Sequence, residues 1–203
     1  MRHTPAIQFI QSIDSSWKGH ELFAIWVVKK IKPRIIVDLG FDTGLSTIAF
    51  AHRNPGHTYG IDWVGESNFP QKRTSMEKAF HNISSALRLK YVKNINLIIG
   101  PSYEISRQWD REIDLLHIDS SHSYDEIKKH YENWRPFLTN NAVILIHDVG
   151  AFPNETGRFF QELDLPKRLF AQGKGLGIAT TNLSLQQEIA DVWEESVNFN
   201  LSS

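Results

Sequence analysis

The sequence predicts an α/β fold, a Rossmann-like doubly wound sandwich of three layers around a mostly parallel sheet. Short apolar runs alternate with helix-length amphipathic stretches, and these runs are rich in Ile, Val and Leu rather than interrupted by polar residues. Such runs are typical of strands covered on both faces, as in a parallel sheet. No repeat, low-complexity segment or Pro/Gly linker divides the chain. Alternation of this kind favours helices on both faces, joined to the strands by right-handed crossovers.

Five strands are expected from the apolar runs, each ending where a turn begins. They are residues 34–40, 57–62, 95–100, 113–119 and 142–148.

Two helices between these strands carry start signals. Residues 74–92 open with Thr74 and Glu77, and residues 123–138 open with Ser123 and Glu126, each pair spaced as in a capping box. The apolar side chains of each helix fall on one face, which predicts packing against the sheet. These faces consist of Met76, Phe80, Ile83 and Leu87 in the first helix and of Tyr124, Ile127, Tyr131 and Trp134 in the second.

Length and composition indicate one domain over residues 1–203, with 1–32 an N-terminal helical segment and 183–203 a C-terminal helical tail. The absence of cysteine excludes disulfides, thiolate zinc sites and cysteine nucleophiles. With 22 basic and 23 acidic residues, the chain suits neither nucleic-acid nor membrane-surface binding. The longest apolar run, "LFAIWVV", is too short to span a bilayer. A cytoplasmic protein is expected, and a homo-oligomer is compatible with the sequence.

A glycine-containing turn follows the first strand in residues 37–51, "VDLGFDTGLSTIAFA". Ligands of doubly wound folds bind beyond the carboxyl ends of the strands. Gly40 and Gly44 would let the backbone turn tightly while a ligand approaches, and Asp38 and Thr43 belong to the same candidate cofactor site. The spacing G-x-x-x-G lacks the second glycine of the dinucleotide fingerprint, which counts against NAD. A purely structural turn is the alternative.

The next two strands also end in candidate cofactor-binding residues. Asp62 lies 24 positions after Asp38 (62 − 38), where an acid at a strand end binds a ribose diol in nucleotide-binding units. Trp63 could stack on an adenine, or could be an ordinary half-buried tryptophan. Ser102 could reach an adenine edge, or could simply cap a helix.

Acidic residues and histidines converge after the fourth and fifth strands. Asp119 ends the fourth strand, His122 follows it, and His147 and Asp148 end the fifth. Because adjacent parallel strands end at the same edge, these four side chains are expected to meet there. Carboxylates with imidazole suit Mg²⁺ or Mn²⁺, whereas an imidazole alone can act as a general base. The alternative, that each residue only caps a turn, is less convincing for two neighbouring strand ends.

The other histidines lack a partnered spacing, so structural or exposed roles are expected for His3, His20, His52, His57, His81, His117 and His130. Core packing is expected for Trp17 and Trp26. The acceptor pocket would be built from the N-terminal segment and the loops 63–73 and 149–156.

The order of these motifs resembles class I S-adenosylmethionine-dependent methyltransferases over roughly residues 17–180. The resemblance rests on "IVDLGFDTGLST", "GIDW", "IDLLHIDSSHSYDEIKKHYENW", "VILIHDV" and "GKGLGIAT". Within the family, the chain is similar to a small branch that carries I-D-G-x-H-x-Y and H-D motifs. That branch is related to macrocin-type sugar O-methyltransferases and cephalosporin-hydroxylase-like proteins. Ser120 stands for a usual glycine, Pro101 for a common aspartate, and His147 for a carboxylate of sugar methyltransferases.

The resemblance implies a seven-stranded sheet whose strand seven, "GLGIATT", is antiparallel. It also implies that Asp38, Gly40 and Gly44 line the methionine end of the cofactor and that Asp62 binds its ribose. Metal-dependent relatives hold Mg²⁺ at the positions that correspond here to Asp119, His147 and Asp148.

The function expected from these residues is S-adenosylmethionine-dependent O-methylation of a small-molecule or glycan hydroxyl. His122 or Asp119 would be the base, and a divalent cation such as Mg²⁺ at Asp119 and Asp148 would acidify the hydroxyl. Two alternatives are a degenerate cofactor-binding module without catalysis and a nicotinamide-dependent oxidoreductase.

Overall fold

A single seven-stranded sheet forms the centre of the computed structural model, which describes residues 4–63 and 70–189. The strand order is β3-β2-β1-β4-β5-β7-β6, and all neighbouring strands are parallel except the two pairs that include β7. This confirms the expected sheet. In chain order the strands are β1 Ile35–Leu39, β2 His57–Asp62, β3 Ile95–Ile99, β4 Ile113–Ile118, β5 Leu138–His147, β6 Lys167–Phe170 and β7 Leu176–Thr180.

Two strands differ from the sequence-based expectation. β5 begins at Leu138, four residues before the expected start, and its pairing with β4 shifts register between Ile113 and Leu115. The seven-stranded sheet implied by the resemblance requires β6, but its position was not predicted, because "KRLF" is short and half polar. It is an edge strand that pairs with β7 alone. The side chains on one face and the backbone along the free edge can therefore face solvent, so polar residues are tolerated there.

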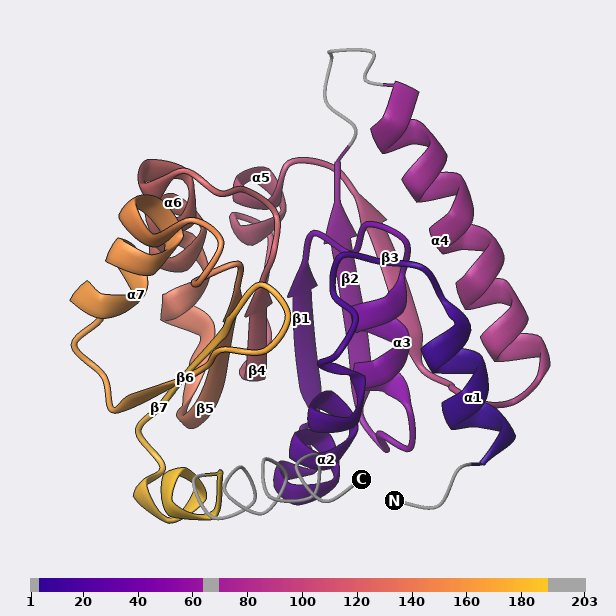
Figure 1. The fold of residues 1–203 in the computed structure, drawn as a ribbon, viewed down its shortest axis with the longest axis horizontal. Coiled ribbons are helices and arrows are strands. Elements are labelled where there is room, and N and C mark those ends of the chain that lie inside the picture. Colours follow the sequence, from indigo (N-terminus) through magenta and orange to yellow (C-terminus); the bar gives the residue numbers. More distant parts are fainter. Residues whose placement is uncertain (1–3, 64–69, 190–203) are drawn as a thin grey trace.

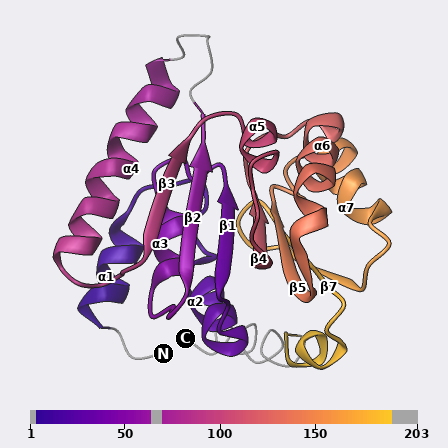
Figure 2. The same cartoon turned by 180° about the vertical axis from the view of Figure 1, so that it is seen from behind.

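Helices cover both faces of the sheet (Figures 1 and 2). The alternating side chains of β1 illustrate the two cores: Ile36 packs with α1 to α4, whereas Val37 and Leu39 pack on the side of α5 and α6. One layer contains α1 Pro5–Ser12, α2 Glu21–Ile31, α3 Leu45–Ala51 and α4 Pro70–Arg88, and the other contains α5 Ser102–Ser106, α6 Tyr124–Trp134 and α7 Arg158–Glu162.

The expected start of the longest helix was wrong, and its expected apolar face was right for Met76 and Ile83 only. α4 begins at Pro70, because proline suits the first helical turn, and Thr74 therefore lies inside the helix. Phe80 and Leu87 are 44% and 41% exposed. The buried stripe consists of Met76, Ala79, Ile83 and Ala86, whose two alanines let the helix approach the sheet closely.

The second expected helix start was right in position but not in chemistry. Ser123 is the residue before α6, yet its side chain makes no capping hydrogen bond. The carboxylate of Glu155 accepts the Tyr124 amide proton at 2.7 Å instead. The loop after β5 thus caps α6.

Some expected elements lie partly outside the described residues, namely 64–69 of the loop 63–73 and 190–203 of the C-terminal tail. Residues 183–189 are helical. Within the described ranges, no helix is both long and apolar enough to cross a membrane.

Candidate active site at the carboxyl edge of the sheet

The candidate site lies where β1, β2, β4 and β5 end together, at the edge to which the arrowheads of β1 and β2 point in Figure 1. Hydrogen bonds beyond the strands hold this edge in register. The Gly40 amide donates to the Ile61 carbonyl, and the Asp119 amide donates to the Leu39 carbonyl, each at 2.8 Å. The residues that follow the strands are therefore fixed relative to one another.

Both glycines of the turn after β1 are required by the protein itself. Gly40 has φ of 89°, and a Cβ there would lie 2.2 Å from the carbonyl oxygen of Asp119. Gly44 has φ of 87° and precedes α3, and a Cβ there would lie 3.2 Å from Ile83 of α4. The positive φ angles confirm the expected tight turn, and the close approach of Asp119 and of Ile83 on α4 is a second reason for these glycines. Their place in a cofactor site stays a prediction.

Asp38 is fully buried and anchors the turn from beneath through a chain of hydrogen bonds. The indole of Trp17 donates to Nε2 of His117 at 3.1 Å, so the ring proton of His117 sits on Nδ1 and is donated to Asp38 at 2.7 Å. Ser46 donates to the other carboxylate oxygen at 2.8 Å, and so does Thr47. Three donors thus hold the Asp38 carboxylate against the first turn of α3. Its influence on a bound ligand would act through that turn.

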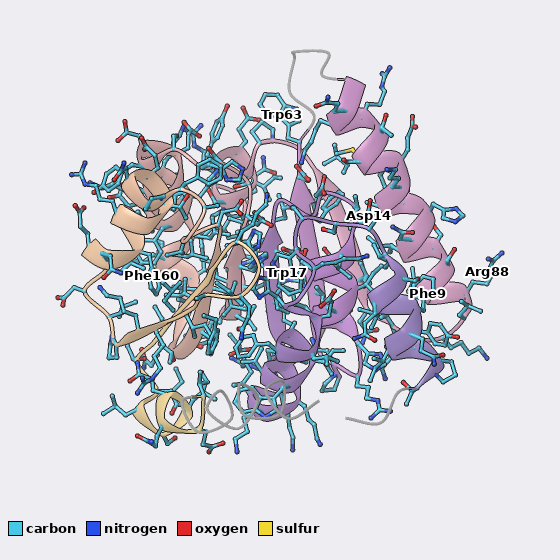
Figure 3. All side chains as sticks on the ribbon, viewed as in Figure 1. Phe9, Asp14, Trp17, Trp63, Arg88 and Phe160 are labelled. Carbon is cyan, nitrogen blue, oxygen red and sulfur yellow. The ribbon has the colours of Figure 1, made fainter. Side chains whose placement is uncertain are left out.

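Asp62 lies at the end of β2 and is 7% exposed. One carboxylate oxygen accepts the Trp63 amide at 2.7 Å, and the other accepts the Asp42 amide at 3.0 Å and Nζ of Lys72 at 2.8 Å. Burial raises the pKa of Asp62, and the charge of Lys72 opposes that rise. Trp63 is 43% exposed, so its indole is accessible at the same edge (Figure 3).

Ser102 is paired with a histidine that the sequence did not single out. Its hydroxyl lies 2.6 Å from Nδ1 of His130 on α6. Burial lowers the pKa of His130. Pro101 occupies the capping position of α5, so Ser102 is not the helix cap that was the alternative expectation. The two partners lie 28 residues apart on different helices, which no local spacing could indicate.

His147 lies between two carboxylates at the ends of β4 and β5. Its Nδ1 is 3.2 Å from Asp119 and 3.4 Å from Asp148. Burial alone lowers the pKa of His147, but its contacts with Asp119 and Asp148 outweigh burial and raise the pKa to about 9. Burial likewise raises the pKa of Asp148, and the contact with His147 outweighs it, so this pKa lies below its ordinary value. The cluster is therefore an imidazolium shared by two carboxylates.

The geometry of the same three residues would allow them to bind a metal ion. One ligand atom from each of Asp119, His147 and Asp148 lies within 4.8 Å of the others. Two carboxylate oxygens and an imidazole nitrogen suit a hard or borderline divalent cation. However, Nδ1 of His147 carries a proton at neutral pH, and a metal ion would have to displace it.

His122 lies beside this cluster and remains accessible. Its Nδ1 is 3.2 Å from Asp148, its side chain is 45% exposed, and its ring stacks on Phe152 with centroids 4.3 Å apart. Asp148 itself has φ of 62°, a strained conformation for a residue with a Cβ, of a kind that concentrates at functional sites. The structure therefore brings together all four residues expected at this edge.

His20 was expected to have only a structural or exposed role, and it lies against the cluster. It is 3% exposed, and its ring centroid is 5.3 Å from that of His147. Burial and the charge of His147 lower the pKa of His20 to about 4. Among the described residues, Nε2 of His20 and Nε2 of His147 have no hydrogen-bond partner. Gly173 in the β6–β7 turn lets the chain pass His20, because a Cβ there would lie 2.9 Å from Nε2.

Comparisons with known proteins show the family and the fold of the chain. A family model described as "Methyltransferase domain" matches residues 37–149. The uncharacterized protein y4gI of Sinorhizobium fredii is 29% identical over 175 residues, which are 81% of this chain and 19% of that protein. The chain thus spans only about a fifth (19%) of the length of this curated relative.

Two solved structures share the fold. The O-methyltransferase TomG from Streptomyces achromogenes, which is involved in tomaymycin synthesis and was solved with S-adenosylmethionine, has a TM-score of 0.67 at 16% identity, covering 88% of this chain and 90% of that one. The O-methyltransferase from Bacillus cereus, solved with S-adenosylhomocysteine, has a TM-score of 0.60 at 15% identity, covering 89% of this chain and 92% of that one.

Proposed function

Because the chain belongs to the methyltransferase-domain family, we propose that it is an S-adenosylmethionine-dependent O-methyltransferase acting on a hydroxyl of a small molecule or glycan. One observation carries this proposal. A glycine turn and an acid at the end of a strand, which suit a nucleoside, lie at the same edge of the sheet as a histidine that is oriented by a carboxylate. The cofactor half consists of the β1 turn and Asp62, and the base half consists of His122 with Asp148.

The residues of the cofactor half fit an adenosyl ligand. Asp62 offers a carboxylate to the ribose diol, and Trp63 beside it exposes an aromatic surface on which adenine could stack. The hydroxyl of Thr43 is buried without a partner among residues 4–63 and 70–189, at the turn that would face the methionine end. When bound, S-adenosylmethionine supplies a methyl group activated on a sulfonium.

His122 is the base that the contacts favour. If Nδ1 donates to Asp148, Nε2 keeps a lone pair and can take the proton of an acceptor hydroxyl. Stacking on Phe152 restricts the ring, which keeps that lone pair in a defined direction. Asp119, the other expected base, already contacts Nδ1 of His147 at 3.2 Å and is only 12% exposed, so an acceptor reaches it less easily than His122.

We place a divalent cation, where one is used, at Asp119, His147 and Asp148. It would bring the chemistry of a Lewis acid that lowers the pKa of the acceptor hydroxyl. Because the proton on His147 competes for the same site, metal binding should strengthen as pH rises.

The remaining features of the proposal rest on composition. The nearly balanced charge supports a small acceptor rather than nucleic acid, and the absence of cysteine supports a cytoplasmic location. A homo-oligomer remains compatible with both.

Calorimetric titration with S-adenosylhomocysteine, in Mg²⁺ and again in EDTA, tests the cofactor assignment. We expect micromolar binding in both conditions. If S-adenosylhomocysteine binds in neither condition, the proposed function is refuted, and NAD would be the next ligand to titrate. Binding without methyl transfer to any of a panel of hydroxylated acceptors would favour a non-catalytic cofactor-binding module.

A further inference from the structure

Asp62 has almost no hydrogen-bonding capacity left for a ligand. A carboxylate offers about four lone-pair directions. Three are used: by the Trp63 amide on one oxygen, and by the Asp42 amide and Nζ of Lys72 on the other. A ribose diol that binds in the bidentate manner requires one lone pair on each oxygen. One present partner of Asp62 must therefore leave when a nucleoside binds.

Only Lys72 is free to leave. The two backbone amides belong to the β1 turn and to the end of β2, which the sheet holds in place. Lys72 lies in the first turn of α4 and is 31% exposed, so its flexible side chain can move into solvent. We propose that Lys72 is an affinity-determining residue of the cofactor site, which occupies Asp62 in the free protein and competes with the cofactor ribose. This inference rests on the proposed function.

The competition follows from the burial of Asp62. The carboxylate is 6% exposed, and burial disfavours its charge, so the free protein gains from a cation at this place. The ribose hydroxyls would replace that cation with two neutral donors. The same ion pair therefore stabilises the free protein and opposes binding, and it also ties the start of α4 to the end of β2.

The test compares Lys72→Met with Lys78→Met, a change of an exposed lysine on the same helix. Calorimetric titration with S-adenosylhomocysteine should give a dissociation constant about fivefold lower for Lys72→Met than for wild type. Lys78→Met should bind like wild type. Thermal unfolding of the ligand-free proteins should show a lower Tm for Lys72→Met alone. In 1 M salt, which screens the partly exposed ion pair, the difference in affinity should shrink.

A second arm isolates the ribose. Adenosine and 2′,3′-dideoxyadenosine are titrated into both proteins, and only adenosine should bind Lys72→Met more tightly than wild type. In an Asp62→Asn background, Lys72→Met should no longer improve affinity.

The outcomes separate the two ideas. If wild type binds S-adenosylhomocysteine and Lys72→Met binds it equally or more weakly, the competition is refuted and the proposed function stands. An equal gain for dideoxyadenosine would also refute it, because the gain would then not involve the ribose. If neither protein binds S-adenosylhomocysteine or adenosine, both ideas fall.

Discussion

Replacing His147 by asparagine should remove much of the alkaline pH dependence of stability. Asparagine keeps a polar side chain near Asp119 and Asp148 but cannot carry a proton. In the wild-type protein, the two carboxylates raise the pKa of the buried His147 imidazole to about 9 from an ordinary value of 6.5. Folding is therefore linked to proton uptake at this residue.

The sign of the effect follows from the raised pKa. The stabilisation is fully present below pH 6.5, where the imidazole is protonated in both the folded and the unfolded chain. Between pH 6.5 and about 9 the folded protein binds the proton more tightly, so stability falls as pH rises and the contribution is lost above about 9. The difference between 6.5 and about 9 corresponds to about 3 kcal/mol for this buried side chain.

Urea unfolding at several pH values, followed by tryptophan fluorescence, measures this effect. The free energy of unfolding of wild type should fall by about 3 kcal/mol more than that of His147→Asn between pH 6.5 and 9.5. His81→Asn, at an exposed position on α4, serves as the control and should follow wild type. Parallel curves for wild type and His147→Asn would show that the imidazole is not held as a cation between the carboxylates.

Three further predictions concern the same edge. His20→Phe should reduce the loss of stability at acid pH, because the pKa of about 4 of His20 makes wild type lose stability as pH falls from 6.5. Urea unfolding between pH 4 and 6.5 checks this, and the same pH dependence of the unfolding free energy in variant and wild type would contradict it. His122→Ala should lower methyl transfer by about 10²-fold or more while S-adenosylhomocysteine affinity, measured calorimetrically, stays near wild type. A fully active variant would remove His122 from the mechanism. Gly40→Ala should cost about 3 kcal/mol or more in urea unfolding, because its Cβ would collide with the Asp119 carbonyl at a φ of 89°. A loss under about 0.5 kcal/mol would show that the turn can rearrange.

The sheet and the composition of its edge could be predicted because parallel strands impose a simple geometry. Once residues 34–40, 113–119 and 142–148 are recognised as buried parallel strands, Asp119, His147 and Asp148 must lie near one another. The burial of both strand faces produces the apolar runs that identify the strands. Position along the chain was therefore sufficient to predict proximity.

Other features depend on packing between distant segments and leave no local pattern. His20 meets His147 only because the chain between α1 and α2 packs onto the sheet, and His130 meets Ser102 only because α5 contacts α6. Lys72 pairs with Asp62 because α4 starts at Pro70, earlier than the capping-box pattern indicated. In each of these pairs, the sequence predicted the position of one element but could not specify the orientation of the other.

The Trp17 indole has a consequence for how the protein can be divided. Trp17 is 1% exposed and packs near the middle of the sheet (Figure 3), against His117 and Phe50. A fragment cut at the start of the family match, residue 37, would lack this side chain. Such a truncation would leave an indole-sized cavity and would remove the donor that fixes the tautomer of His117 beneath Asp38. The unit that folds therefore extends at least twenty residues upstream of the unit that the family pattern recognises, from position 37 back to position 17.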